Sequence, residues 1–102
     1  MFASAQAGEL CIRHCVRSMK AGDTSLADCL AAVQEMLATC TAAGTLTALQ
    51  SRYLKDMLKV SLQVCETSEA ECRKHAEKHP ECKACAEACV ACMKETRAAL
   101  AA

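Results

Sequence analysis

Four cysteines near the end of the chain follow one another at helical spacing. Cys82, Cys85, Cys89 and Cys92 are separated by steps of three, four and three residues, so at 100° per residue they stay within about 80° of one helix face. A face that packs only by hydrophobic contact needs large apolar side chains, whereas thiols fill little volume and bind soft metal ions well. The spacing therefore predicts a helix face that binds metal.

The remaining cysteines also fall on the predicted inner faces of helices. The chain has ten cysteines in 102 residues, and a helix period places Cys29 and Cys40 on one seam and Cys65 and Cys72 on another. Because the thiols belong to several helices, we expect them to form a column in the core. The predicted metal ligands are Cys11, Cys15, Cys29, Cys40, Cys65, Cys72, Cys82, Cys85, Cys89 and Cys92.

Charge counting separates the candidate metals. Cu(I) is monovalent, so one ion per bridging thiolate gives a neutral buried core. Zn(II) bound by four thiolates would occupy ten cysteines with only about two ions, each site carrying excess negative charge. The sequence therefore favours Cu(I) as the bound ion, with about ten ions per chain.

Several other soft or borderline donors accompany the thiols. His14, Met19, His75 and His79 are predicted near the end of the bundle that holds Gly22 and Pro80, where they could act as auxiliary ligands or as the access point for metal. Met36 faces the seam of Cys29 and Cys40, as a ligand or as gap-filling packing.

Two alternative functions remain open from the residues alone. Cys72-x2-His75 and His79-x2-Cys82 have the spacing of a Cys2His2 zinc site, which would indicate a structural or regulatory zinc module. A copper metallochaperone is the other alternative. It would need one accessible ion in an exposed loop, and the helix seam argues against that.

Four helices are predicted to position these residues. Gly22 ends the first, which covers about 4–20, and Asp23 or Thr24 caps a second that reaches about residue 43 and stops at Gly44. The third begins at Thr45 or Thr47, or later after a longer loop, and continues to about residue 78. Pro80 begins the fourth, which reaches about residue 100. Residues 1–102 are expected to form one domain.

Short connections make neighbouring helices antiparallel, so we expect an all-α, up-down-up-down four-helix bundle with cysteine side chains lining the core. A rise of about 1.5 Å per residue puts one cysteine of each helix at a common level. Cys40 is predicted to lie deepest in the column. Because it is separated from the other cysteines in sequence, it could also be a buried apolar residue and not a ligand. The common level is predicted to comprise Cys15, Cys29, Cys72 and Cys85.

Composition excludes several classes of function. Twelve basic residues balance twelve acidic ones, so the chain lacks the net positive charge typical of proteins that bind nucleic acids or anionic membranes. No apolar run approaches the roughly 18 residues of a membrane span, and no catalytic constellation is recognisable. We therefore expect a binding protein, not an enzyme, with neither nucleic acid nor a membrane as its partner.

The cysteine density would also suit a disulfide-rich secreted protein. Such proteins are rich in loops, however, and this chain has only three glycines and one proline. Two cysteines three or four residues apart on a helix also have poorly directed Cβ vectors for a disulfide. We therefore expect free thiols and a cytoplasmic location, although the small residues Ala3, Ser4 and Ala5 would also suit the end of a removed export signal.

Two motifs resemble those of the bacterial copper storage proteins. The first is Cys11-Ile12-Arg13-His14-Cys15, and the second covers 71–92, with Cys, His and Ala in the pattern Glu-Cys-x2-His-Ala-x2-His-x2-Cys-x2-Cys-Ala-x-Ala-Cys-x2-Cys. This resemblance extends over nearly the whole chain. It implies a four-helix bundle whose core cysteines bind many Cu(I) ions, with His and Met near the open end where copper enters.

The resemblance also implies a homo-oligomer, with a tetramer as the form that the family suggests. It does not identify the copper donor or acceptor. The chain departs from the family pattern at Ser4, Ser68 and Thr96, where cysteine would often stand. Hydroxyls are poor Cu(I) ligands, so we expect a lower capacity and a locally interrupted column.

Overall fold

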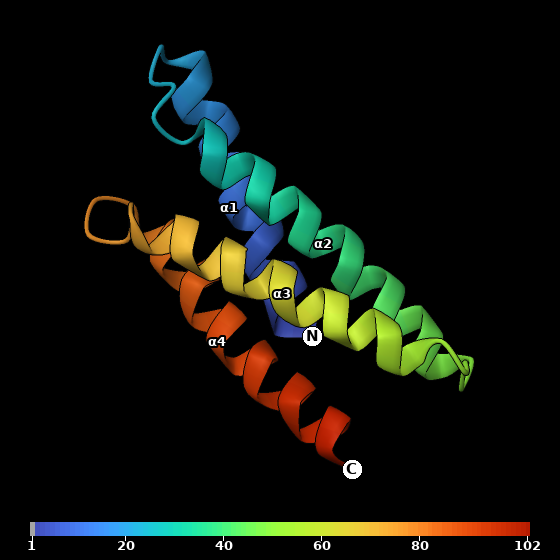
Figure 1. Ribbon diagram of the computed structural model, residues 1–102. Coiled ribbons are helices and arrows are strands. Elements are labelled where there is room, and N and C mark those ends of the chain that lie inside the picture. Colours follow the sequence, from blue (N-terminus) through green and yellow to red (C-terminus); the bar gives the residue numbers. More distant parts are fainter. Residues whose placement is uncertain (1) are drawn as a thin grey trace.

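The protein folds into four α-helices, as seen in a computed structural model that describes residues 2–102 (Figure 1). The described residues contain no strand, so the predicted all-α class is confirmed. The helices are α1 (Phe2–Lys20), α2 (Ala27–Ala48), α3 (Leu54–Arg73) and α4 (Pro80–Ala101).

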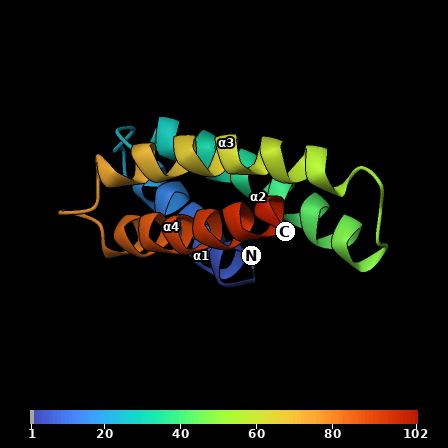
Figure 2. The same ribbon diagram turned by 60° about the horizontal axis from the view of Figure 1, so that its bottom comes forward.

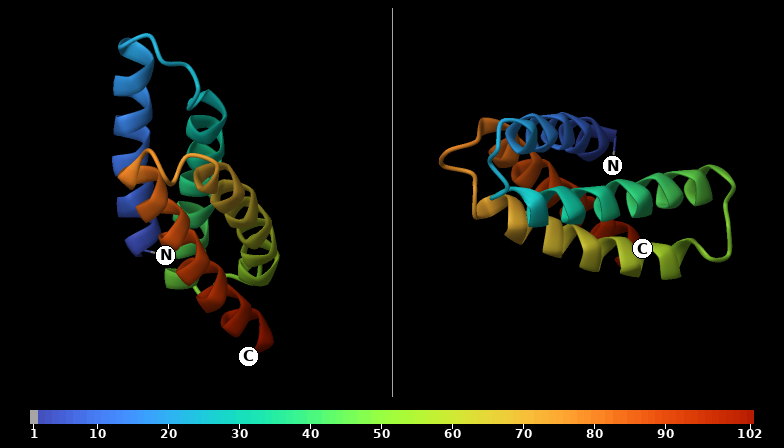
Figure 3. Two further views of the ribbon diagram at one scale, coloured as in Figure 1. Left: turned by 90° about the vertical axis from the view of Figure 1, so that its left-hand side faces the viewer. Right: turned by 90° about the horizontal axis from the view of Figure 1, so that it is seen from above.

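The helices alternate in direction and form an elongated bundle with overall extents of 45 × 20 × 17 Å (Figure 2). Within the described residues, α1 and α3 each pack against α2 and α4. The α1–α2 and α3–α4 connections lie at one end, here called the loop end, and the α2–α3 connection lies at the other, here called the hairpin end (Figure 3). The predicted up-down-up-down bundle is confirmed.

The end of α1 is determined by Gly22, as the sequence predicts. Gly22 has a φ of 94°, a region that residues with a Cβ rarely adopt. Its N–H donates to the carbonyl of Met19 at 3.0 Å, and the N–H of Asp23 donates to that of Ser18 at 2.9 Å. These two bonds make a Schellman motif, which satisfies carbonyls left free at the helix end.

The bounds of α2 differ from the prediction at both ends. The helix begins at Ala27, because Asp23 accepts a bond from the N–H of Ser25 and so caps the preceding turn instead. It continues through Gly44 to Ala48, since an interior glycine costs only about 1 kcal/mol. The end comes at Gln50, whose φ of 51° completes a second Schellman motif.

The third helix is shorter than predicted at both ends. It begins at Leu54, which is the later of the predicted starting points, after a longer loop. It ends at Arg73, not near residue 78. Pro80 disfavours a helical conformation for the residue before it, and His79 is extended, with φ −132° and ψ 100°. Residues 74–79 therefore form the turn into α4, which begins at Pro80 as predicted.

The core is lined mainly by thiols, with a few large apolar side chains packed among them. All ten cysteines are at most 4% exposed, and Leu26, Val33 and Met36 are fully buried with them. Leu58 on α3 is also buried, whereas its neighbours Leu54, Met57 and Leu62 are only partly buried. The predicted placement of the cysteines in the interior is confirmed.

The composition of α2 corrects the expectation that no apolar segment approaches the length of a membrane span. Ala27–Ala48 is long enough, with a mean hydropathy of 1.2, to meet the length and composition criteria for a membrane span. Its buried seam of Cys29, Val33, Met36 and Cys40 accounts for much of that apolar character. The same features are typical of a core helix in a bundle.

Two glycine substitutions should change stability in opposite directions. We expect Gly22→Ala to lower the free energy of unfolding by roughly 1–2 kcal/mol, because φ there is positive. Gly44→Ala should raise it by about 1 kcal/mol, because the site is interior to α2 and an added Cβ would meet nothing within 4 Å. Urea denaturation of the reduced, metal-free protein, followed by circular dichroism, measures both. Equal effects of the two substitutions would contradict the described helix ends.

Candidate metal centre

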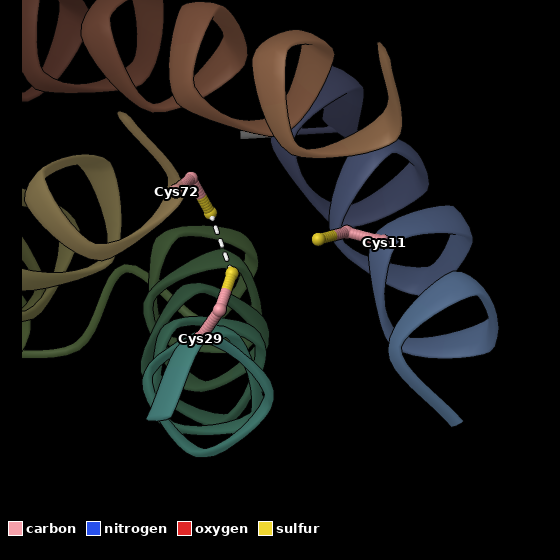
Figure 4. A group of neighbouring side chains, drawn as sticks. All are labelled: Cys11, Cys29 and Cys72. Carbon is pink, nitrogen blue, oxygen red and sulfur yellow. Dashed lines mark hydrogen bonds between the residues drawn. The ribbon is translucent and has the colours of Figure 1, made fainter. Parts of the chain in front are cut away.

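Three helices bring one cysteine each to a common point near the loop end. The sulfurs of Cys11 on α1, Cys29 on α2 and Cys72 on α3 all lie within 4.8 Å of one another (Figure 4). The Sγ atoms of Cys29 and Cys72 are 3.4 Å apart. Cys11 also contacts Cys15 at 4.0 Å and Cys82 at 3.9 Å. These five residues are called the loop-end cluster below.

A second group lies nearer the middle of the bundle. The sulfurs of Cys40 on α2, Cys65 on α3 and Cys92 on α4 lie within 4.8 Å of one another, with 3.9 Å between Cys40 and Cys65. The thiol of Cys89, one turn before Cys92, interacts with that of Cys65. These four residues are called the mid-bundle cluster.

Cys85 joins the two clusters into one column. Its thiol interacts with those of Cys11 and Cys72 on one side and with that of Cys89 on the other. All ten cysteines are free, and the sulfur separations of 3.4–4.0 Å between contacting thiols are far longer than the about 2.0 Å of a disulfide. The structure therefore shows a continuous path of reduced sulfur through the core.

The levels of the cysteines correct the rise arithmetic in two places. Cys11, not Cys15, joins Cys29 and Cys72, because Cys11 lies nine residues before the end of α1 while the other two lie within two residues of their helix ends. The end of α1 therefore projects beyond its neighbours at the loop end (Figure 3).

Cys40 is likewise not isolated. It lies 13 residues after the start of α2, and Cys92 lies 12 residues after the start of α4, so their depths match once the later start of α2 is known. Cys40 therefore lies at the level of Cys65 and Cys92, and not deeper than they do as the rise arithmetic predicts.

Hydrogen bonds between thiols raise the pKa of some cysteines and lower that of others within each cluster. In the loop-end cluster, the bond with Cys11 raises the pKa of Cys29 to about 11, and the same interaction lowers the pKa of Cys11. In the mid-bundle cluster, hydrogen bonds from Cys40 and Cys65 lower the pKa of Cys92 to about 2, and the interaction with Cys40 raises that of Cys65. Hydrogen bonds with Cys65 and Cys85 likewise lower the pKa of Cys89 to about 4. The loop-end cluster thus has one sulfur that favours the thiolate, and the mid-bundle cluster has two.

Burial raises the pKa of the thiols at the edge of the column. Desolvation is the main cause that raises the pKa of both Cys15 and Cys82, because the apolar interior disfavours the charged form. For Cys85, hydrogen bonds with Cys11 and Cys72 raise the pKa, and burial adds to the effect. In the absence of metal, these thiols stay protonated at neutral pH.

The geometry of both groups of three fits a thiolate-bound metal ion. An ion about 2.3 Å from each of three sulfurs places those sulfurs about 4.0 Å apart. The sulfurs of each group lie within 4.8 Å of one another before any adjustment. Soft thiolates without oxygen or nitrogen ligands select ions such as Cu(I).

Histidines gather at the loop end, as predicted. The Nε2 atom of His14 lies 2.7 Å from the Nδ1 atom of His79, and the His14 Nδ1 atom faces the carboxylate of Glu81 at 3.6 Å. The ring of His75 meets that of His79 edge-on, at 6.3 Å between centroids. Met19, 37% exposed, lies on the last turn of α1.

The alternative Cys2His2 zinc site is not formed in the structure. Among the described residues, two groups of at least three Cys, His, Asp or Glu donors are close enough to hold an ion, and both consist of cysteine alone. Cys72 belongs to the first of these groups, while His79 bonds His14 instead of Cys72 or Cys82. The structure therefore gives no support to a site built from Cys72, His75, His79 and Cys82.

Helical periodicity places Ser61 on the α3 seam with Cys65, and the structure shows it 3.7 Å from the sulfur of Cys40. Sequence reasoning missed one residue at this centre. Glu81 approaches His14 from another helix. No local pattern in the sequence marks that contact.

Comparison with known proteins identifies the family of this chain. A family model described as copper storage protein matches residues 1–101. The chain is also 32% identical over 104 residues to an uncharacterised cysteine-rich protein, YhjQ, of Bacillus subtilis, covering 90% of this chain and 94% of the relative. The chain therefore belongs to the copper storage protein family, which is a family of binding proteins and not of enzymes.

Metal binding should compete with protons. Because the pKa of several core thiols is raised, a bound ion must displace a proton, and apparent affinity should fall as pH falls. We expect about a tenfold loss per pH unit for each proton displaced per ion. Cu(I) competition titrations at several pH values between 6 and 9, corrected for the chelator's own protonation, measure this slope. An affinity independent of pH would mean that the core thiols are already ionised.

Proposed function

We propose that this protein stores or sequesters Cu(I), binding about ten ions per chain through the thiolates of its core cysteines. The observation that carries this proposal is the column itself, in which ten free, buried thiols form two groups of three and are joined through Cys85. Membership of the copper storage protein family supports copper as the cargo. The chemistry of the donors supports the proposed oxidation state and number of ions.

Burial favours the monovalent ion. A thiolate that leaves water for a helical core is costly unless its charge is neutralised. One Cu(I) per sulfur, with each sulfur bridging two ions, leaves the column neutral. A divalent ion in either group of three would leave one net negative charge on that site, with the remaining thiolates still to be compensated.

We further propose that the protein acts in a reducing compartment such as the cytoplasm. Ten free thiols with sulfurs 3.4–4.0 Å apart could be oxidised in pairs in an oxidising environment. Copper ions are the proposed partners, with no role for nucleic acid or a membrane. We also propose self-association, which the family resemblance implies.

The first test of this function is stoichiometry. Anaerobic Cu(I) titration of the reduced protein against a competing chelator should reach about ten ions per chain, from one ion per sulfur. Replacement of all three cysteines of one group, Cys40, Cys65 and Cys92, by serine should lower the count by about three while the bundle stays helical by circular dichroism. A plateau at one or two ions in the parent protein would contradict storage and favour a chaperone or a zinc module.

The second test concerns access at the loop end, where His14, Met19, His75 and His79 form what we propose to be the mouth of the column. Histidine and methionine donors can hold an arriving Cu(I) ion before its carrier leaves. We expect His14→Ala with His79→Ala to slow copper uptake severalfold in stopped-flow measurements, because this pair is in direct contact. The final count should be unchanged.

His75→Ala is the matched control, since His75 meets His79 only at the ring edge. Its effect on the rate should be smaller. A loss of one or more ions from the final count in the double variant would make these histidines storage ligands and contradict their role in access.

A further inference from the structure

Four hydroxyl side chains are buried inside the thiol-lined bundle. Ser4, Ser61, Ser68 and Thr96 are each at most 3% exposed. The family pattern accounts for three of these positions as replacements of cysteine. It does not say what the hydroxyls do to the sulfurs beside them.

The serine contacts fall on the mid-bundle cluster. The Oγ atom of Ser61 lies 3.7 Å from the sulfur of Cys40, and that of Ser68 lies 3.6 Å from the sulfur of Cys89. In the loop-end cluster the corresponding neighbours of each sulfur are other thiols, at 3.4–4.0 Å. The two clusters therefore offer copper different surroundings.

The difference between hydroxyl and thiol neighbours becomes important when copper displaces the protons of the thiols. The thiol of Cys89 is hydrogen-bonded to the hydroxyl of Ser68 in the metal-free protein, and the serine hydroxyl can rotate to be the donor when the sulfur is a thiolate. Such a charge-assisted bond uses a lone pair of the sulfur. A sulfur that accepts this bond has less electron density to share with a second copper ion, and the hydroxyl oxygen is itself a poor ligand for Cu(I).

We propose that Ser61 and Ser68 divide the stored copper into two populations, one held tightly by the loop-end cluster and one held loosely by the mid-bundle cluster. The inference rests on the proposed storage function and deepens it. The loosely held ions have fewer bridging sulfurs, so they are the first to pass to a competing thiol or chelator. Ser61 and Ser68 are thus positioning residues that act through Cys40 and Cys89.

Thr96 provides a matched control within the same cluster. Its hydroxyl donates to the backbone carbonyl of Cys92 at 2.8 Å, and its oxygen lies 4.0 Å from the sulfur of that residue. A hydroxyl has only one hydrogen to donate. Because that hydrogen is already used by the backbone, Thr96 cannot withdraw electron density from the Cys92 thiolate in the way proposed for the serines.

The test compares Ser61→Ala/Ser68→Ala with Thr96→Val and the parent protein. In anaerobic Cu(I) competition titrations, the parent should show two affinity classes. In the serine double variant the weaker class should tighten roughly tenfold, the scale expected for loss of a hydrogen bond to a charged group. X-ray absorption should then show more short copper–copper contacts, which report bridging sulfurs. Thr96→Val should leave both measurements unchanged.

Three results would overturn the proposal: a single affinity class in the parent at full capacity, an unchanged or weaker second class in the serine variant, or equal effects of the serine and threonine changes. The single variants Ser61→Ala and Ser68→Ala give the same comparison if the double variant does not fold. A parent capacity of only one or two ions would instead contradict the storage function. The two failures are therefore distinguishable.

Discussion

Burial of ten thiols in one small bundle is the constraint on which the rest of the structure depends. A protonated thiol behaves as a small apolar group and enters a core at little cost, whereas a thiolate in the same place needs a compensating charge. Raised pKa values at Cys15, Cys29 and Cys82 keep much of the column neutral without metal. The same sulfurs bind soft ions once their protons are displaced.

This constraint explains how apolar packing is distributed. Cysteine fills less volume than leucine, so a thiol-lined core needs large side chains elsewhere to hold the helices together. Leu26 closes the start of α2, Met36 lies fully buried between the levels of Cys29 and Cys40, and Leu58 is buried on α3. The bundle can therefore reserve one part of its interior for metal while ordinary packing stabilises the remainder.

The clusters also show why the cysteines are spread over four helices. Three thiols on one helix lie in a row and cannot surround an ion, whereas Cys11, Cys29 and Cys72 approach a common point from three directions (Figure 4). Metal binding then joins helices that are distant in sequence. Copper loading is thereby expected to stabilise the bundle, since an ion that binds only the folded state adds its binding free energy to folding.

The sequence by itself determined the number of helices, the faces that bear cysteine and the soft character of the donor atoms, because helical periodicity and thiol chemistry are local properties. The mid-helix Gly44 was a misleading signal, since helix interiors tolerate glycine and Gln50 ends α2 instead.

Only the tertiary structure decided which cysteines meet. Axial register between helices depends on loop geometry and on packing such as that of Gly8, where an added Cβ would lie 2.9 Å from Met36. That close approach, together with the projecting end of α1, places Cys11 instead of Cys15 beside Cys29 and Cys72. A shift of one helical turn, about 5.4 Å, exceeds the spacing of the sulfurs themselves. Periodicity along a single helix carries no information about such a shift.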